Sequence, residues 1–432
     1  MRSYICGGLD APNLRLAQRD VIEAPVEVAC DTVKALGKCS AVVGSTRRGW
    51  TMPGPLRQGF HMIADHGPQR IARLTPLAEV LDSLQSSVEA VVPFKTGAFA
   101  AIGLTLAADA AVTSDRPPAA LAMRDGYAVR AEVTADAGGY APGPLDPAPE
   151  RVDLGEPLPM EVDAVAPLDA VAWAGGRAEA LAPVAPGDGV LLAGADAPAG
   201  MVLRPAGARL RRIDAAALQA VGIEQVAVRR PRLRVVRASQ GAAVEAAAGF
   251  VREAIEAEGG RAIADENVSL SAGLSADDCD SIIAIGGTGS GSNDRSVVAL
   301  EKAGRVAFHG IAISPGETTA LGFVCSRPVL LLPGRLDAAV AGWLLVGRPL
   351  LARLALRLIE EQLFTAELSR KVASPLGLAQ VVPVCHRLDT VEPLGASYLA
   401  PQAFTRSYGW ILVPADSEGF PPGTPIPVRP WP

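Results

Sequence analysis

The feature that most constrains this chain is a glycine-rich loop between an apolar run and a helical pattern. Residues 282–285 read Ile-Ile-Ala-Ile, residues 286–294 read Gly-Gly-Thr-Gly-Ser-Gly-Ser-Asn-Asp, and the helical pattern begins near Arg295. Glycines free backbone amides to point at an anion, hydroxyl groups add donors, and a helix N-terminus favours negative charge. The loop therefore predicts a phosphate site, with a flexible loop that binds nothing as the alternative.

The loop matches neither common nucleotide-binding motif. No Lys-Ser or Lys-Thr pair follows the glycines, as a P-loop requires, and the spacing does not match GxGxxG with a downstream ribose carboxylate.

Two further turns lie nearby, Leu-Pro-Gly-Arg at residues 332–335 and Ser-Pro-Gly at residues 314–316. Turns at the carboxyl ends of parallel strands form the crevice in which open α/β sheets bind ligands. We expect Arg335 to pair with an anion there and Asp337 to cap the next helix. The turn at 314–316 either closes one side of the crevice or is an ordinary connection.

The order of predicted elements indicates an α/β domain over residues 229–365. Strands are expected at 232–236, 282–285 and 329–332, and helices over 244–258, from Arg295 and from Asp337. Such alternation predicts a parallel sheet covered by helices.

The rest of the chain divides into four further parts. Residues 1–73 are an unassigned extension, and residues 74–130 with 202–228 form a helical and linker domain, with helices expected from Leu74, over 98–111 and over 212–221. Residues 131–201 are rich in Pro and Gly and predict a β-rich module. Residues 366–432 predict a small C-terminal β domain.

Composition excludes several classes of protein. The net charge is -6 and the basic residues are scattered, so no nucleic-acid surface is expected. Six cysteines lie far apart without a CxxC pair, which favours a reducing cytoplasm. Lys95, Arg348 and Arg353 interrupt the apolar stretches, and no signal-peptide pattern opens the chain, so no membrane segment is expected.

Scattered aspartates are the candidates for metal chemistry. Asp125, Asp188, Asp196 and Asp265 each lie in a turn-like context, where a turn or capping role is the simpler interpretation. Together, they offer the hard oxygen ligands that Mg²⁺ prefers. The histidines at positions 61 and 66 have a spacing that fits no usual ligand pair, so neither a histidine zinc site nor a Ser-His-Asp triad is expected.

These pieces, taken in order, resemble the MoeA/gephyrin family of molybdopterin molybdenumtransferases from about residue 74 to the C-terminus. The matching motifs are Arg116-Pro117-Pro118, Asp125-Gly126-Tyr127-Ala128-Val129, Gly194-Ala195-Asp196, Gly286-Gly287 with Gly291 and Asp294, Ser314-Pro315-Gly316, and Leu332-Pro333-Gly334. The ending over residues 409–424 is also similar to the family's terminal β domain. The resemblance implies a multidomain α/β protein with a MogA-like three-layer molybdopterin-binding domain, β-rich modules and a small C-terminal β domain.

The resemblance also implies a reaction and its residues. Adenylated molybdopterin and molybdate would be the substrates, with Mg²⁺-assisted loss of AMP, in a cytoplasmic homodimer whose cleft the partner completes. A molybdoenzyme or a MogA-like protein would be a further partner. Carry-over gives Asp125, Asp196, Asp265 and Asp294 as catalytic carboxylates, with Asp265 and Asp294 as metal ligands. The residues expected to hold the pterin and its phosphate are Gly286, Gly287, Thr288, Gly289, Ser290, Gly291, Ser314, Pro315, Gly316, Pro333, Gly334 and Arg335.

Departures from the family pattern leave the activity open. The family's Thr-Gly-Asp-Glu-Leu is replaced by Arg-Ala-Ser-Gln-Gly-Ala-Ala at residues 237–243, and its Met before Asp-Gly-Tyr is replaced by Arg124. The family's Lys-Pro-Gly-Lys-Pro is replaced by Ser-Pro-Gly-Glu-Thr at residues 314–318, and its Gly-Asn-Pro by Gly-Arg-Leu at residues 334–336. Metal sites depend on their ligand count. The alternatives are therefore a cofactor-binding protein or chaperone without turnover, and an adaptor whose β modules bind a protein.

Overall fold

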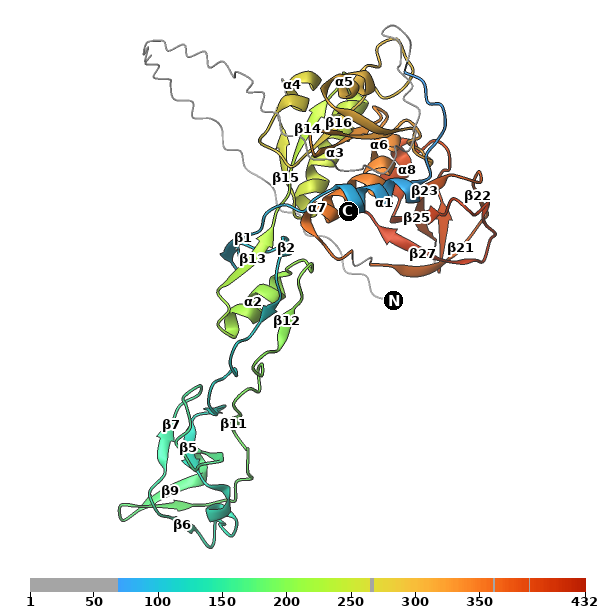
Figure 1. Cartoon of the computed structure of the whole chain (residues 1–432). Helices are drawn as coiled ribbons and strands as arrows, with labels where there is room; N and C mark the ends of the chain where they lie inside the picture. Colours follow the sequence, from blue (N-terminus) through green and yellow to red (C-terminus); the bar gives the residue numbers. More distant parts are fainter. Residues whose placement is uncertain (1–68, 265–267, 360–361, 388) are drawn as a thin grey trace, which may run out of the picture. The chain divides into compact units, whose positions relative to one another are not determined.

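The computed structural model describes residues 69–264, 268–359, 362–387 and 389–432 (Figure 1). Asp265, expected as a metal ligand, lies outside these ranges, as do His61, His66 and residues 1–68 of the expected extension.

A six-stranded sheet is the centre of the α/β domain. In spatial order its strands are β15 (Arg261–Ala264), β14 (Arg232–Arg237), β16 (Ser281–Ile285), β20 (Arg327–Leu332), β19 (Ala320–Val324) and β17 (Arg305–His309). The first four strands are parallel, whereas β19 and β17 are antiparallel. The strands expected at β14, β16 and β20 are confirmed and are parallel, and the antiparallel strands β19 and β17 extend the expected parallel sheet. The sequence analysis missed β15, β17 and β19, because runs of four or five residues are too short to show a clear period.

Helices cover both faces of this sheet and complete three layers. They are α1 (Leu77–Ser87), α3 (Ala242–Ala257), α4 (Leu270–Ser275), α5 (Ser296–Ala303), α6 (Leu336–Gly342) and α7 (Arg348–Ala355). Successive strand residues point to opposite faces of a sheet. Ile283 and Ile285 therefore pack with α3, α6 and α7 in one core, whereas Ile282 and Ala284 pack with α4 and α5 in the other. Figure 1 shows these helices around β14 and β16.

One long helix has the length and composition of a membrane span. Leu336–Ala355 joins α6 and α7 through a π-helical segment, and its mean hydropathy is 1.3, but 83% of it is buried inside the protein. Such burial is that of a core helix. The helix begins at Leu336 with Arg335 as its N-cap, so the capping position expected for Asp337 is wrong by two residues.

The domain of residues 74–130 and 202–228 is built on short paired strands. Its elements are β1 (Phe94–Gly97), β2 (Thr105–Leu106), β3 (Ala110–Ala111), β12 (Val202–Arg204), α2 (Arg212–Ala220) and β13 (Gln225–Arg229). Strand β13 pairs with β1 and β2, and β12 pairs with β3, so segments from both sides of the intervening module lie together.

Helix α2 confirms one prediction in this domain, and the expected helix over 98–111 is wrong. Turns over 98–103 lead into β2 and β3 instead. Gly103 has φ +84°, which a helix does not allow, and pairing with β13 and β12 outweighs the helix propensity of the alanines.

The intervening module consists of small antiparallel sheets. Its strands are β4 (Leu121–Ala122), β5 (Gly126–Val129), β6 (Gly143–Leu145), β7 (Glu150–Val152), β8 (Ala164–Pro167), β9 (Val171–Ala174), β10 (Arg177–Ala180) and β11 (Val190–Leu191). They form the sheets β7-β5-β8, β6-β10-β9 and β11-β4. Strands β4 and β5 precede residue 131 and pair with strands beyond it.

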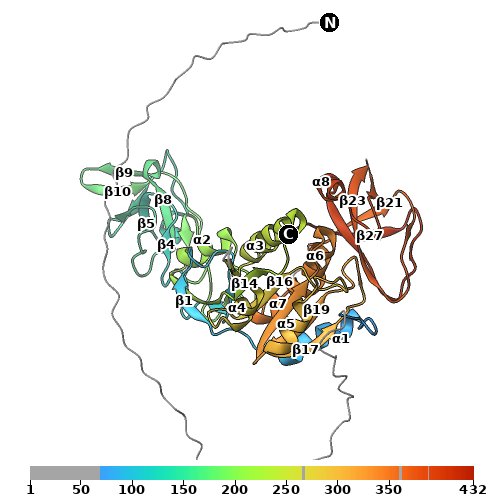
Figure 2. The same ribbon diagram turned by 90° about the horizontal axis from the view of Figure 1, so that it is seen from above.

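The C-terminal domain is a small barrel. Its elements are β18 (Ile313–Ser314), β21 (Phe364–Leu368), β22 (Val372–Ala373), β23 (Ala379–Arg387), β24 (Thr390–Pro393), α8 (Pro401–Arg406), β25 (Gly409–Val413), β26 (Gly419–Phe420) and β27 (Pro425–Pro430). The sheet closes because β25 pairs with both β23 and β27. Figure 2 shows β21, β23 and β27 gathered in this domain. Strand β18 pairs with β23, which fixes Ser314 beside Gln380.

Candidate functional site

The glycine-rich loop lies where the strand order of the α/β sheet reverses. From β14 the chain moves outward to β15, then returns to β16 on the other side of β14. Ligands bind at such a switch point, beyond the carboxyl ends of the strands. The turns after β14, β16 and β20 meet there: a Cβ on Gly286 would lie 2.0 Å from Ser239 Oγ, and a Cβ on Gly334 would lie 3.4 Å from Gly286 Cα. Position 286 therefore requires glycine, both for this close approach and for its φ of +99°.

Side chains of the loop and of α5 fix the loop's conformation. Ser296 Oγ donates to the carbonyl of Gly286 at 2.6 Å. Asp294 Oδ2 accepts from the amide of Gly291 at 2.8 Å, and a Cβ on Gly289 would lie 2.8 Å from the same oxygen. Asp294 thus caps the loop from within, and one oxygen of this expected catalytic carboxylate is used for that purpose.

Gln69 occupies the N-terminus of α5. Its side chain is buried, and its Nε2 donates to the carbonyls of Gly287 and Gly289, both at 2.9 Å. Its Oε1 accepts from the amides of Val297 at 2.8 Å and Val298 at 3.2 Å. These amides belong to the first turn of α5, whose donors an anion would otherwise use. The N-terminus of α5, which was expected to help bind the phosphate, therefore already has the amide oxygen of Gln69 bound to it.

The loop itself keeps its donors. Within the described part of the chain, the backbone amides of Gly287, Thr288, Gly289 and Ser290 have no hydrogen-bond partner. Thr288 is only 2% exposed. Gly287 is also buried, whereas Gly289 is half-buried and Ser290 is exposed. Buried amides without a partner are rare in folded proteins, so those of Gly287 and Thr288 call for a ligand or water to satisfy them. These successive donors make residues 287–290 the most anion-receptive part of the crevice.

The turn at residues 314–318 lies against this loop. Thr318 Oγ1 is 2.9 Å from Thr288 Oγ1, and His309 Nε2 is 3.1 Å from the carbonyl of Thr288. Burial lowers the pKa of His309, so its ring is neutral near pH 7. Of the two interpretations of this turn, the geometry favours the one in which it closes a side of the crevice.

Arg335 is paired within the protein. Its guanidinium lies 2.6 Å from Asp337 Oδ2 and 5.3 Å from the ring centroid of Tyr398, and the hydrogen bond to Asp337 raises its pKa. Asp337 is 2% exposed and also accepts from the amide of Leu399. Asp337 therefore already neutralises Arg335, which was expected to pair with an external anion.

The expected carboxylates do not gather into one site. Asp125 is exposed and accepts from the amide of Leu154 at 2.8 Å in the β-rich module, and Asp196 is also exposed. Asp188 pairs at 2.7 Å with Arg124, which gives the residue that replaces the family's methionine a structural role. Over 69–264, 268–359, 362–387 and 389–432, no three Asp, Glu, His or Cys side chains are placed to hold a metal ion. The described carboxylates therefore do not form a ligand set for Mg²⁺ by themselves.

Known proteins share this arrangement of domains. One family model, described as the MoeA N-terminal region (domain I and II), matches residues 71–222, and another, described as "Probable molybdopterin binding domain", matches residues 234–353. A molybdopterin biosynthesis MoeA protein from Pyrococcus horikoshii covers 83% of this chain and 99% of its own, with 27% identity and a TM-score of 0.68. The chain belongs to the MoeA-like family.

Further matches agree with the MoeA-like assignment. A second structure of a MoeA protein from Pyrococcus horikoshii covers 83% of the chain and 100% of its own at 23% identity, with a TM-score of 0.65, and supports the fold. MJ0666 of Methanocaldococcus jannaschii, whose name assigns it to molybdopterin biosynthesis, is 30% identical over 148 residues, which is 33% of this chain. That alignment spans 34% of the length of MJ0666.

The sequence analysis missed several residues of this MoeA-like crevice. Ser239 lies against Gly286 where the family has its acidic motif, close to Arg237, which pairs with Glu245. Its position directly after a buried strand is a signal that could have identified it. Gln69 and Thr318 offer no such signal, because their partners in the glycine-rich loop and α5 are distant in sequence.

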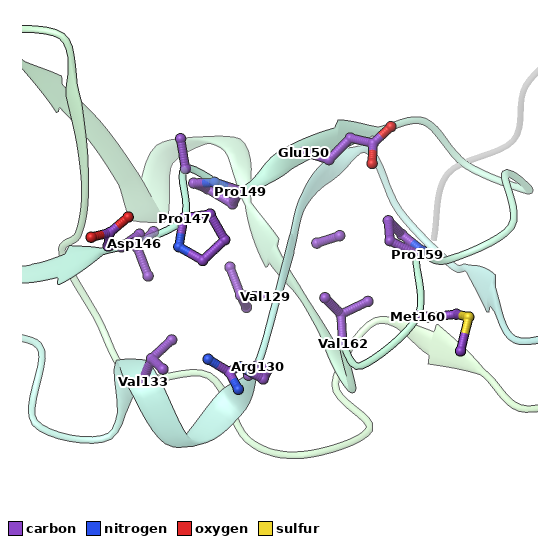
Figure 3. A pocket seen from close by; sticks show the side chains of 13 residues that line it. Val129, Arg130, Val133, Asp146, Pro147, Pro149, Glu150, Pro159, Met160 and Val162 are labelled. Atoms are coloured by element: carbon purple, nitrogen blue, oxygen red, sulfur yellow. The ribbon is translucent and has the colours of Figure 1, made fainter.

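A separate hollow lies in the β-rich module of this MoeA-like chain. Figure 3 shows Val129, Pro147 and Val162 around it, together with Arg130 and Glu150. Its volume is about 220 Å³, below the roughly 300–1,000 Å³ of common ligand pockets. None of the expected site residues lines it, so we do not assign the hollow to the site.

Proposed function

We propose that this protein binds molybdopterin and acts in molybdenum cofactor biosynthesis. The observation that carries the proposal is the row of unpaired amides at residues 287–290, at the switch point of a domain matched by a molybdopterin-binding family model. Phosphate oxygens suit such amides, because hydrogen bonds to a charged acceptor are the stronger kind. The pterin phosphate would bind these amides rather than the N-terminus of α5, which Gln69 fills.

The turns around the loop would hold the remainder of the pterin. The turn at 314–318 contacts the loop through Thr318, and Gly334 brings the turn after β20 against Gly286. Main-chain groups of these turns would then contact the pterin ring, because the glycines of the turns carry no side chain that would block it. This assigns Ser314, Pro315, Gly316, Pro333 and Gly334 to positioning of the ligand.

The reaction we propose is insertion of molybdate into adenylated molybdopterin with release of AMP. Asp125 and Asp196 are exposed and lie far in sequence from Asp294, which caps the loop. In a homodimer, the β-rich module of one copy would bring these carboxylates to the crevice of the other copy. The described residues do not form a magnesium site, so no step is assigned to that ion. We place this reaction in the cytoplasm, with a molybdoenzyme or a MogA-like protein as the further partner.

A second candidate is carriage of molybdopterin or molybdenum cofactor without turnover. Two observations favour it: Asp294 already uses one oxygen to cap the loop, and Ser239 lies where the family's acidic motif would face the crevice. Both changes reduce the carboxylates available for chemistry, but they leave the amides of residues 287–290 in place.

AMP release from adenylated molybdopterin, with molybdate and Mg²⁺ present, separates these candidates. We expect wild type to release AMP and Asp125→Ala to lose that release. The matched control is Asp136→Ala, which removes another exposed aspartate of the same module and should leave the rate unchanged. Binding without AMP release would replace the transferase with the carrier. Absence of binding would contradict both.

A further inference from the structure

A second, larger cavity lies apart from the molybdopterin crevice. It has a volume of about 950 Å³, at the upper end of the usual range for ligand pockets. It is bounded by residues 204–213 around the start of α2, residues 256–258 at the end of α3, residues 357–359 after α7 and residues 429–432 after β27. None of the residues expected to hold the pterin lines it. Whatever binds here is therefore separate from the pterin site.

The cavity is strongly basic. The arginines that line it are Arg204, Arg209, Arg211, Arg212, Arg348, Arg357 and Arg429, and we call it the arginine cleft. Among the described residues, the carboxylates that line it are Glu256 and Glu258. A cleft lined by one sign of charge concentrates its field and attracts ligands of the opposite sign.

Two carboxylates beside these arginines are each shared by two guanidinium groups. Glu258 pairs with both Arg348 at 2.8 Å and Arg357 at 2.7 Å. Asp214 is shared in the same way by Arg204 at 3.2 Å and Arg211 at 2.7 Å. The pair of Arg348 and Arg357 therefore carries about one positive charge more than the carboxylate of Glu258 neutralises.

Arg209 adds a further cation. Its guanidinium donates to the carbonyls of Gly103 at 3.0 Å and Ala257 at 2.7 Å, which are neutral acceptors. Burial lowers the pKa of Arg209, and repulsion from Arg357 and Arg348 lowers it further. An anion placed among these three arginines would relieve that repulsion.

We propose that the arginine cleft binds a small molecule that carries a diphosphate group. Guanidinium groups bind phosphate oxygens through paired hydrogen bonds, and several arginines suit a group with more than one negative charge. Ile102, Leu210, Ile213 and Leu358 also line the cleft and offer an apolar surface to an organic moiety attached to the diphosphate. This proposal does not depend on the pterin site.

Isothermal titration calorimetry of the full chain with inorganic pyrophosphate and with ADP tests the proposal. We expect both to bind, more weakly as the salt concentration rises. Tighter binding of ADP would assign the apolar surface to the organic moiety, and equal binding would show that the diphosphate carries the recognition. Binding of neither compound would overturn the proposal.

Variants locate the binding. Arg209→Ala and Arg212→Ala should each weaken pyrophosphate binding by about tenfold, the loss of one hydrogen bond to a charged group. Arg212 is exposed, so its substitution keeps the test valid if Arg209→Ala fails to fold. The control is Arg261→Ala, an exposed arginine on β15 outside the cleft, which should bind as wild type does. Binding that survives both cleft substitutions but is lost in Ser290→Pro would place the diphosphate in the glycine-rich loop and overturn the proposal.

Discussion

Replacement of Gln69 by alanine should release the N-terminus of α5. The side chain makes hydrogen bonds of 2.8–3.2 Å with the amides of Val297 and Val298 and with two loop carbonyls. A net value of about 0.5–1.5 kcal/mol for each bond gives roughly 2–6 kcal/mol. Water entering the vacated space would satisfy part of what is lost, so we expect about 3 kcal/mol.

Hydrogen exchange measures this loss locally. The amides of Val297 and Val298 lie in the first turn of α5, where the helix itself offers them no acceptor. Their protection in wild type therefore depends on Gln69. A loss of about 3 kcal/mol corresponds to exchange that is faster by roughly 100-fold, since each 1.4 kcal/mol is a factor of ten. Gln85→Ala is the matched control, because Gln85 is exposed on α1 and should leave these amides unchanged. Equal exchange of residues 297 and 298 in wild type and Gln69→Ala would refute the capping role.

Two further predictions concern the crevice. Gly286→Ala should lower the thermal midpoint by several degrees, because the new Cβ would lie 2.0 Å from Ser239 Oγ at a φ of +99°. Adding Ser239→Gly should restore only part of the lost thermal midpoint. Full recovery in the double variant would show that the backbone angle costs nothing. Burial lowers the pKa of His309 below the ordinary histidine value of 6.5. As the pH falls, the imidazole of His309 therefore binds a proton in the unfolded state before it does so in the folded state. Stability should therefore decrease from pH 7.5 to pH 5.5, and this decrease should be smaller in His309→Gln; the same pH dependence in both proteins would contradict a buried neutral ring.

Local patterns in the sequence predicted the centre of the α/β domain. The strand at 281–285, the glycine-rich loop and α5 follow one another directly in the sequence. An apolar run, a group of glycines and a helical periodicity therefore identify them without information on tertiary contacts. The same applies to α2, α3 and β20. The proposal that the loop binds an anion follows from the chemistry of its glycines, and its unpaired amides support that proposal.

The rest depends on contacts between distant residues. Gln69 fills the end of α5 from 228 positions away, and no local pattern marks it. The run 98–111 is apolar and rich in alanine, yet its pairing with residues beyond 200 makes it strand and turn. Asp294 was expected to face a metal ion, but the close approach of Gly291 makes it a cap. In each case the partner, rather than the residue type, decides the role.

The most direct test of molybdopterin binding at the loop amides is the affinity of the ligand for a variant that lacks one of them. Ser290→Pro removes the amide hydrogen of Ser290, and Ser292→Pro introduces the same residue into the same loop outside the row 287–290. We predict that wild type binds molybdopterin and that Ser290→Pro binds it about ten- to a hundredfold more weakly, as expected for a lost hydrogen bond to phosphate, while Ser292→Pro stays within about threefold of wild type. No binding by wild type, or equal affinity in wild type and Ser290→Pro, would contradict the account.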